Sequence, residues 1–362
     1  MSSKCYVLGI ETSCDETAAS VVDADGRVLS SIVFSQIDMH NIYGGIVPEL
    51  ASRDHALKIK HVVEQALSAS KLSADDITHV GVTSGPGLLG CLLVGLSFAK
   101  AFAMSKNIPL IEVDHVRAHV MSAFINGVSG TPRFPFAGLV VSGGHTSIYL
   151  VKSVNDIVAV SSTVDDAAGE VFDKLARFIG LGYPGGKAVS ELARKGNAAA
   201  FASATAVKFP KPVIKGREGD FSFSGLKTSA INYFRNAAAA RNSTGVTAHN
   251  GAHISVDVKK EDALAAFQET ICEVLVEKLI AAAVDNNVSD VVIGGGVASN
   301  YRLRELFVQK AKQNSLNPCL IPIEYCTDNA AMIANYARLL IGDKKGFNSE
   351  MSKIKAYSTT RR

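Results

Sequence analysis

Short apolar runs and helix-spaced apolar positions alternate along the first third of the chain. Strand-like runs cover Tyr6–Ile10, Ala18–Val22 and Arg27–Ser35, where apolar residues cluster between polar turns. Helices and strands are then predicted in alternation, at Asp54–Ala69, Val80–Thr83, Leu88–Met104, Leu110–Val113 and His115–Ile125. The predicted order is therefore β-β-β-α-β-α-β-α.

The same order begins again after Asn126–Pro135, a segment with Gly and Pro and without periodicity, which is typical of a linker. The second succession is predicted at Phe136–Val141, Ser147–Val151, Val158–Ser162, a helix near Asp166, a long helix Glu261–Val284, a strand Val291–Ile293, a helix from Ser299, a strand near Leu320 and a last helix from Asp328. Extra residues lie between about 184 and 258, and the Ala-, Asn-, Ser- and Gly-rich part Ala237–Val256 predicts a mobile loop.

Two copies of one βββαβαβα unit indicate an α/β fold of duplicated ribonuclease H-like domains, the architecture of actin, hexokinase and Hsp70 (ASKHA). We expect a first domain at residues 1–130, and a second at 131–362 that contains the insertion at about 184–258 and the C-terminal helix. The two domains should face each other across a cleft, which holds a nucleotide by analogy of fold alone.

Composition supports a folded chain and sets few limits on its partners. Hydrophobic residues make up 47% and charged residues 20%, and the net charge of +3 is too small to indicate nucleic acid by itself. The six cysteines include no CxxC pair, which fits a reducing compartment. We expect a cytoplasmic protein without a membrane span, because no signal peptide is visible and no apolar stretch approaches ~18 residues. The basic end of the chain, which could hold a polyanion or be merely solvated, contains Lys344, Lys345, Lys353, Lys355, Arg361 and Arg362.

Glycine- and hydroxyl-rich turns are candidates for phosphate binding. Glu11–Thr17 and Ser142–Thr146 lie at equivalent places in the two halves, and such turns can present backbone N–H groups and hydroxyls to a phosphate. An ordinary hairpin turn is the alternative. Gly294–Asn300 follows a strand and opens a helix, so its glycines would let a base or ribose approach, or would serve tight packing. Gly85-Pro86-Gly87 lies before the helix predicted from Leu88, and its glycines are as compatible with close packing of that helix as with anion binding.

A histidine pair is the candidate metal site. His115 and His119 are four residues apart in a helical stretch, so both imidazoles lie on one helix face. Two histidines and a carboxylate suit zinc or iron. We expect the carboxylate to come from Asp328 at the start of the last helix. Helix capping is the alternative role of Asp328. The run lacks the glutamate of the HExxH motif, which excludes the zincin protease mechanism.

Taken together, these motifs resemble the tRNA threonylcarbamoyladenosine transferase family (TsaD type), formerly described as O-sialoglycoprotein endopeptidases or glycoproteases. The matching segments run in family order and are GIETSCDET (9–17), GGIVPELASRDH (44–55), GPGLLG (85–90), HVRAH (115–119), LVVSGGHT (139–146), DDAAGEVFDK (165–174), YPGG (183–186), DFSFSGLK (220–227), GGGVASN (294–300) and CTDNAAMIA (326–334).

The resemblance implies one divalent metal per subunit, Fe²⁺ before Zn²⁺, held by His115, His119 and Asp328. It also implies that the adenylate and threonylcarbamoyl groups are bound by Val140, Val141, Ser142, Gly143, Gly144, Asp173, Gly186 and Asn300. The implied reaction moves a threonylcarbamoyl group from threonylcarbamoyl-AMP to N6 of adenosine 37 in tRNAs that read codons starting with A. Asp15 or Glu16 would orient the amine or accept its proton.

The family also implies partners, namely a shorter paralogous subunit (TsaB type) and a small ATPase (TsaE type), with a homodimer as a further arrangement. Three other functions stay open from the sequence: an ATPase or sugar kinase of the same fold, a metallopeptidase, and a scaffold that only binds nucleotide. An ATPase or sugar kinase function would give the histidine pair no role.

Overall fold

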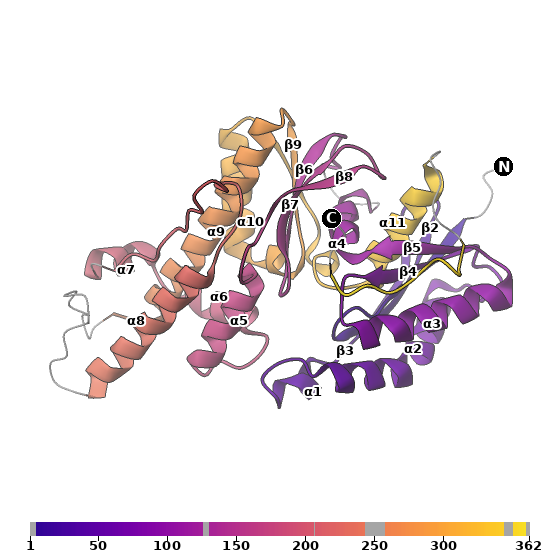
Figure 1. Ribbon diagram of the computed structural model, residues 1–362, viewed down its shortest axis with the longest axis horizontal. Helices are drawn as coiled ribbons and strands as arrows, with labels where there is room; N and C mark the ends of the chain where they lie inside the picture. The colour runs from indigo at the N-terminus through magenta and orange to yellow at the C-terminus, as the bar shows by residue number, and fades with distance from the viewer. Residues whose placement is uncertain (1–4, 126–129, 206, 243–257, 344–349, 360–362) are drawn as a thin grey trace.

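Two five-stranded sheets of the same topology form the framework of the protein (Figure 1). The structure is a computed structural model and describes residues 5–125, 130–205, 207–242, 258–343 and 350–359. The first sheet has the order β3-β2-β1-β4-β5 and the second the order β10-β9-β6-β7-β8. Their strands are β1 Tyr6–Glu11, β2 Glu16–Asp23, β3 Val28–Ser35, β4 His79–Gly85, β5 Leu110–Asp114, β6 Phe136–Val141, β7 Thr146–Val151, β8 Ile157–Ser162, β9 Asp290–Gly294 and β10 Asn317–Leu320.

Strand pairing is equivalent in the two sheets, which confirms the predicted duplication. In each half the first three strands form an antiparallel meander, and the first strand pairs in parallel with the fourth, which pairs in parallel with the fifth. Central strands β1 and β6 are buried almost throughout, because helices cover both faces of a sheet of this kind. The turns β1–β2 and β6–β7 therefore occupy equivalent places.

Helices α1 (Ile37–Asn41), α2 (Pro48–Ser70) and α3 (Leu89–Lys106) belong to the first half, where α2 and α3 pack on each other and on the sheet. Helix α3 is long and apolar enough, by length and composition alone, to cross a membrane. The expectation that no stretch reaches that length was therefore wrong. Because Cys91, Leu92, Leu96 and Ala99 are buried against the rest of this half, a packed helix with one apolar outer face accounts for the composition.

The second half carries more helices than the sequence pattern predicted. Its helices between β8 and β10 are α5 Ala168–Phe178, α6 Gly185–Ala193, α7 Ala198–Ala204, α8 Ser224–Asn242, α9 Lys260–Asp285 and α10 Tyr301–Gln313, of which α6, α7 and α8 were not predicted. The predicted mobile loop at Ala237–Val256 is wrong for its first part, because α8 continues to Asn242. The remainder of that loop lies outside the described residues. Alanine is the best helix former, so the alanine run extends the helix.

Helices α4 (His115–Met121) and α11 (Ala330–Gly342) join the two halves. Helix α4 contacts β5 of the first sheet and β6 and β9 of the second, and a 3-10 turn at Ser122–Phe124 follows it where a single helix to Ile125 was predicted. Helix α11 follows β10 in the chain but packs on β1, β2 and β4. The end of the chain thus returns to the first half, so residues 131–362 do not pack as one unit.

Candidate functional site

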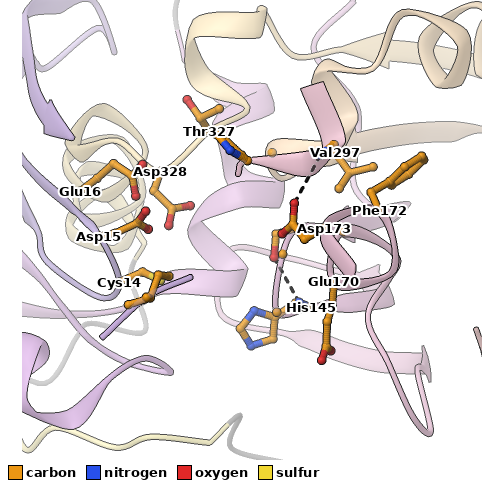
Figure 2. A pocket seen from close by; sticks show the side chains of 18 of the residues that line it. Cys14, Asp15, Glu16, His145, Glu170, Phe172, Asp173, Val297, Thr327 and Asp328 are labelled. Atoms are coloured by element: carbon orange, nitrogen blue, oxygen red, sulfur yellow. Dashed lines mark hydrogen bonds between the residues drawn. The ribbon is translucent and has the colours of Figure 1, made fainter. Parts of the chain in front are cut away.

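A cavity of about 890 Å³ opens between the two halves. Its lining residues come from loops and helix starts of both halves, at the ends of the central strands. Figure 2 shows Cys14, Asp15, Glu16 and Asp328 on one side, and His145, Glu170 and Asp173 on the other. Of the sequence-predicted residues, those that line the cavity are Asp15, Glu16, His115, Ser142, Gly143, Gly144, Asp173, Gly186, Asn300 and Asp328.

The histidine pair sits at the end of β5, as the sequence predicted. Asp114 caps α4 by accepting the backbone N–H of Arg117 at 2.9 Å, so the helix begins at His115. His115 and His119 are both buried, and their rings meet edge to face with centroids 4.8 Å apart. His115 lines the cavity, whereas His119 is not among the lining residues.

Asp328 completes a cluster of three possible metal ligands. Its Oδ1 lies 3.1 Å from Nε2 of His119 and 3.6 Å from Nε2 of His115. Helix α11 begins at Ala330, and Asn329 caps it by accepting the N–H of Met332. The capping alternative for Asp328 is therefore wrong, because its neighbour performs that role and leaves Asp328 free to face the histidines.

Glu11, at the end of β1, holds His115 from behind and was missed by the sequence reasoning. Its carboxylate is fully buried and accepts hydrogen bonds from Nδ1 of His115 at 3.0 Å, the hydroxyl of Thr83 and the N–H of Ser13. Burial lowers the pKa of His115, but the carboxylates of Asp328 and Glu11 outweigh it and raise that pKa to about 9. The two carboxylates thus stabilise positive charge at His115.

These residues fit a divalent metal on their chemistry. Two imidazoles and one carboxylate offer ligand atoms within 4.8 Å of one another. The Glu11–His115 hydrogen bond is the carboxylate–histidine arrangement that orients metal-binding imidazoles. Among the residues that the structure describes, Nδ1 of His119 is a buried ring nitrogen without a hydrogen-bond partner. Such a set is unusual in an ordinary core.

The turn between β1 and β2, residues 12–15 (the first turn), is clamped by its neighbours. Three consecutive carbonyls, of Ser13, Cys14 and Asp15, accept hydrogen bonds from the N–H of Leu88, from Nε2 of His55 and from the N–H of Gln36 at 2.8, 3.0 and 2.9 Å. Burial, followed by the charges of Asp15 and Asp328, raises the pKa of the Glu16 carboxyl well above its usual value. The first turn contains Asp15, is followed directly by Glu16 and has its carbonyls held by hydrogen bonds, so it is an acidic, fastened turn and not an open phosphate cradle.

The turn between β6 and β7, residues 142–145 (the second turn), is open. The N–H of Ser142 donates to the carbonyl of His145 at 2.8 Å, and the N–H of His145 donates to the Ser142 hydroxyl, so a tight loop exposes the glycines between them. An added Cβ at Gly143 or Gly144 would meet no atom of the surrounding protein within 4 Å. Burial, and then the charge of His115, lowers the pKa of His145 to about 4, so its imidazole is neutral at pH 7.

Asp173 and Gly186, both implied as binding residues by the resemblance, meet on the second-half wall of the cavity. The Asp173 carboxylate on α5 accepts the N–H groups of Gly185 and Gly186 at the start of α6, at 2.7 and 3.3 Å. An added Cβ at Gly185 would lie 2.4 Å from Cβ of Ala176, so glycine is needed for α6 to pack this closely. Burial raises the pKa of Asp173.

The side chains of three other residues that the resemblance implied for binding have contacts within the protein. Val140 and Val141 lie in β6 with fully buried side chains and do not line the cavity. Asn300 lines it, but its Oδ1 caps α10 and its amide donates to Gln268 and Ser190. The Asn300 side chain thus fixes the loop Gly294–Asn300 rather than pointing freely into the cavity.

Comparison with known proteins identifies the family. The family model described as TsaD, tRNA N6-adenosine threonylcarbamoyltransferase, matches residues 27–335. This chain belongs to the tRNA N6-adenosine threonylcarbamoyltransferase family. It is 43% identical over 329 residues to the protein of that name from Caldicellulosiruptor bescii, with 91% of each chain covered. It is 44% identical over 343 residues to that from Anaeromyxobacter dehalogenans, with 94% of this chain and 96% of the other covered.

Solved structures with the same fold support the ASKHA architecture. Full-length HypF in its phosphate- and nucleotide-bound form matches with a TM-score of 0.58 at 12% identity, over 94% of this chain and 56% of that one. Component A of (R)-2-hydroxyglutaryl-CoA dehydratase from Acidaminococcus fermentans matches with a TM-score of 0.51 at 13% identity, over 94% and 100%. At such identities the likeness shows the fold alone.

In this threonylcarbamoyltransferase family member, the motifs DDAAGEVFDK (165–174) and DFSFSGLK (220–227) are joined by hydrogen bonds and ion pairs. Asp165 accepts hydrogen bonds from the hydroxyls of Ser222 and Ser224 and from the N–H of Phe223. Asp166 pairs with Lys174 and Lys227. The DFSFSGLK segment therefore fastens the start of α8 to the loop before α5, the helix that carries Asp173.

Proposed function

We propose that this protein transfers a threonylcarbamoyl group from threonylcarbamoyl-AMP to N6 of adenosine 37 in tRNAs that read codons starting with A. A bond forms between N6 and the carbamoyl carbon, and the bond from that carbon to the phosphate oxygen breaks. AMP leaves with the bonding electron pair, and N6 loses one proton. The cavity between the two halves supports this reaction, because it brings an open glycine turn and an acidic turn to the same space.

The second turn would hold the phosphate. The exposed backbone at Gly143 and Gly144 can be approached closely, since a substituent there would meet no protein atom within 4 Å. Backbone N–H groups in such a turn bind anions and can stabilise the phosphate as AMP leaves. His145 is the last residue of this turn, and its neutral imidazole can donate a further hydrogen bond.

His115, His119 and Asp328 would hold a divalent metal, with Fe²⁺ proposed before Zn²⁺. Such a metal, when bound, supplies a Lewis acid for a carbonyl oxygen. Glu11 keeps Nδ1 of His115 occupied, so Nε2 is the ring nitrogen directed at Asp328. The buried Glu11 and Thr83 pair fixes that ring orientation in advance.

The acidic side of the cavity would receive the acceptor amine. Asp15 and Glu16 line the cavity beside Asp328 (Figure 2). A carboxylate there can orient the exocyclic amine, and a Glu16 carboxyl with a raised pKa can hold the proton that N6 releases. The adenosine must be unstacked from its loop to reach this point, as base-modifying enzymes require.

One observation carries the proposal: His115 and Asp328 of the three-residue cluster line the same cavity between the two halves as the open second turn. The test incubates the chain with threonine, bicarbonate, ATP, the adenylate-forming enzyme and tRNA, with and without partner proteins, and measures modified adenosine by mass spectrometry of the digested tRNA. We expect product with wild type and none above background with His119→Ala. The control His61→Ala, at an exposed histidine of α2, should keep full activity.

Absence of product in every combination would overturn the proposal. ATP turnover with a small hydroxyl acceptor, unaffected by His119→Ala, would favour a kinase instead. Casein cleavage lost in His115→Ala would favour a metallopeptidase.

We further propose a cytoplasmic enzyme that works with a shorter paralogous subunit and a small ATPase. Exposed apolar side chains on α2 and α3 support a protein partner, because Leu57 on α2 and Leu89, Leu93 and Met104 on α3 are about half or more exposed. Exposed leucines grouped on one face are typical of protein interfaces. A second copy of this chain is the alternative occupant, which the partner-free arm of the reconstitution distinguishes.

A further inference from the structure

The C-terminal strap, defined as residues 350–359, runs back over the first half of the molecule. In Figure 1 the yellow end of the chain passes β4 and β5 and ends between the two halves. Ile354 is fully buried in the core of the first half, and Lys100 of α3 donates to its carbonyl at 2.8 Å. The strap is therefore anchored in the fold and is not a loose basic tail.

Beyond Ile354 the strap contacts the end of β4 at very short range. The N–H of Tyr357 donates to the carbonyl of Ser84 at 2.9 Å. A Cβ at Gly85 would lie 2.2 Å from the carbonyl oxygen of Tyr357, and Gly85 has a φ of +154°. Only glycine permits the strap to lie here. Gly85 thus serves strap packing, whereas a Cβ at Gly87 would lie 2.6 Å from the carbonyl oxygen of Ser13.

The Tyr357 hydroxyl reaches the residue that starts the metal-binding helix. It donates to Oδ2 of Asp114 at 2.7 Å, while Oδ1 of the same carboxylate accepts the N–H of Arg117 at 2.9 Å. Asp114 is the N-cap of α4, and His115 follows it directly. Both oxygens of the capping carboxylate are therefore fixed, one by the helix and one by the strap.

The next residue of the strap, Ser358, lines the cavity, as do Pro86 and Gly87. The strap thus contributes both to the support of α4 and to the cavity wall.

We propose that the C-terminal strap is part of the active site, and that Tyr357 is a positioning residue that holds the start of α4, and with it His115, through Asp114. This inference rests on the metal site proposed above. Outer partners of metal ligands change metal affinity by about 10–100-fold, and Tyr357 acts one residue further out, so we expect a loss of about threefold to tenfold.

The test measures Zn²⁺ affinity of the full chain by competition with a chromogenic chelator. Tyr357→Phe keeps the ring and removes only the hydroxyl, so it should weaken Zn²⁺ binding while the melting temperature stays close to wild type. Asp114→Ala removes the acceptor for Tyr357 together with the acceptor for the Arg117 N–H. The double variant should bind Zn²⁺ no more weakly than the single variant with the lower Zn²⁺ affinity, because both changes remove the hydrogen bond between Tyr357 and Asp114.

Two controls separate the hydroxyl from the strap in general. Ser352→Ala removes an exposed hydroxyl that donates to Glu350 at 3.1 Å on the same strap, and should leave Zn²⁺ affinity unchanged. A chain that ends at Thr359 lacks Arg361 and Arg362 and should also bind Zn²⁺ as wild type does.

Wild-type affinity in Tyr357→Phe, or strictly additive losses in the double variant, would overturn the positioning role while leaving the metal site intact. A wild-type chain that binds no Zn²⁺ would overturn the metal site itself, and the positioning role with it.

Discussion

The first and second turns occupy the same place in the two halves and are built in opposite ways. In the first turn the carbonyls of residues 13–15 are held by Leu88, His55 and Gln36, and Glu11 accepts the N–H of Ser13. In the second turn Gly143 and Gly144 face open space. One duplicated hairpin therefore provides a rigid acidic support on one side and an accessible backbone on the other.

This difference indicates a division of roles. The first turn shares Glu11 with His115, so its rigidity is transmitted to the proposed metal ligands. The second turn keeps its glycine backbone accessible, so a phosphate can approach it. A duplicated fold can hold both chemistries because each half needs to perform only one.

The largest effect is expected at Glu11. Glu11→Gln keeps the size of the side chain but places an amide where a carboxylate accepts from His115 and Thr83. Zn²⁺ affinity should fall by about 10–100-fold, the range for outer partners of metal ligands, and transfer activity should fall with it. Competition with a chelator measures the Zn²⁺ affinity, and the amount of modified adenosine measures the transfer activity. Glu64→Gln, at an exposed glutamate of α2, is the control.

A smaller effect is expected at the second turn. Gly143→Val places a branched side chain where the phosphate would approach, and its Cβ would meet no atom of the surrounding protein within 4 Å. We expect the KM for threonylcarbamoyl-AMP to rise about tenfold, equal to a loss of about 1.4 kcal/mol of binding, with little change in melting temperature. Gly225→Val, also in open space but on α8, should leave KM unchanged. An unchanged KM in Gly143→Val would remove the second turn from the phosphate site.

The smallest effect is expected at His55, which supports the first turn from α2. Its Nε2 donates to the Cys14 carbonyl, and its Nδ1 pairs with the Thr17 hydroxyl at 2.7 Å. His55→Gln should cost about 1 kcal/mol of folding free energy at pH 7.5, the net worth of one hydrogen bond, as measured by urea unfolding.

The cost at His55 should also depend on pH. Burial lowers the pKa of His55 below its usual 6.5, so the unfolded chain takes up this proton more readily than the folded one. The stabilisation by His55 is present above pH 6.5 and is lost as the pH falls below it. Because glutamine does not titrate, the difference between wild type and His55→Gln should shrink toward pH 5.5. A constant difference would contradict the neutral state of His55.

Strands and the duplicated order could be predicted because each strand is a run of apolar residues between polar turns. The histidine pair was equally visible, since four-residue spacing on a helix fixes a shared face. The short helices α1, α6 and α7 were missed, because their hydrophobic faces are short and are completed by neighbours far away in the chain.

The partners of the site residues could not be predicted. Glu11 and His115 are 104 positions apart, and no local pattern connects them. Asp328 and Asn329 are both good capping residues, and only the position of the α11 start separates the ligand from the cap. The same holds for Tyr357, whose role depends on a strap that returns across the molecule.

The most direct test of the division between the two turns is a crossed binding measurement. Zn²⁺ and AMP affinities are measured by calorimetry for wild type, Glu11→Gln and Gly143→Val. We predict that Glu11→Gln loses Zn²⁺ affinity and keeps AMP affinity, and that Gly143→Val does the reverse. Parallel loss of both ligands in either variant would contradict the account.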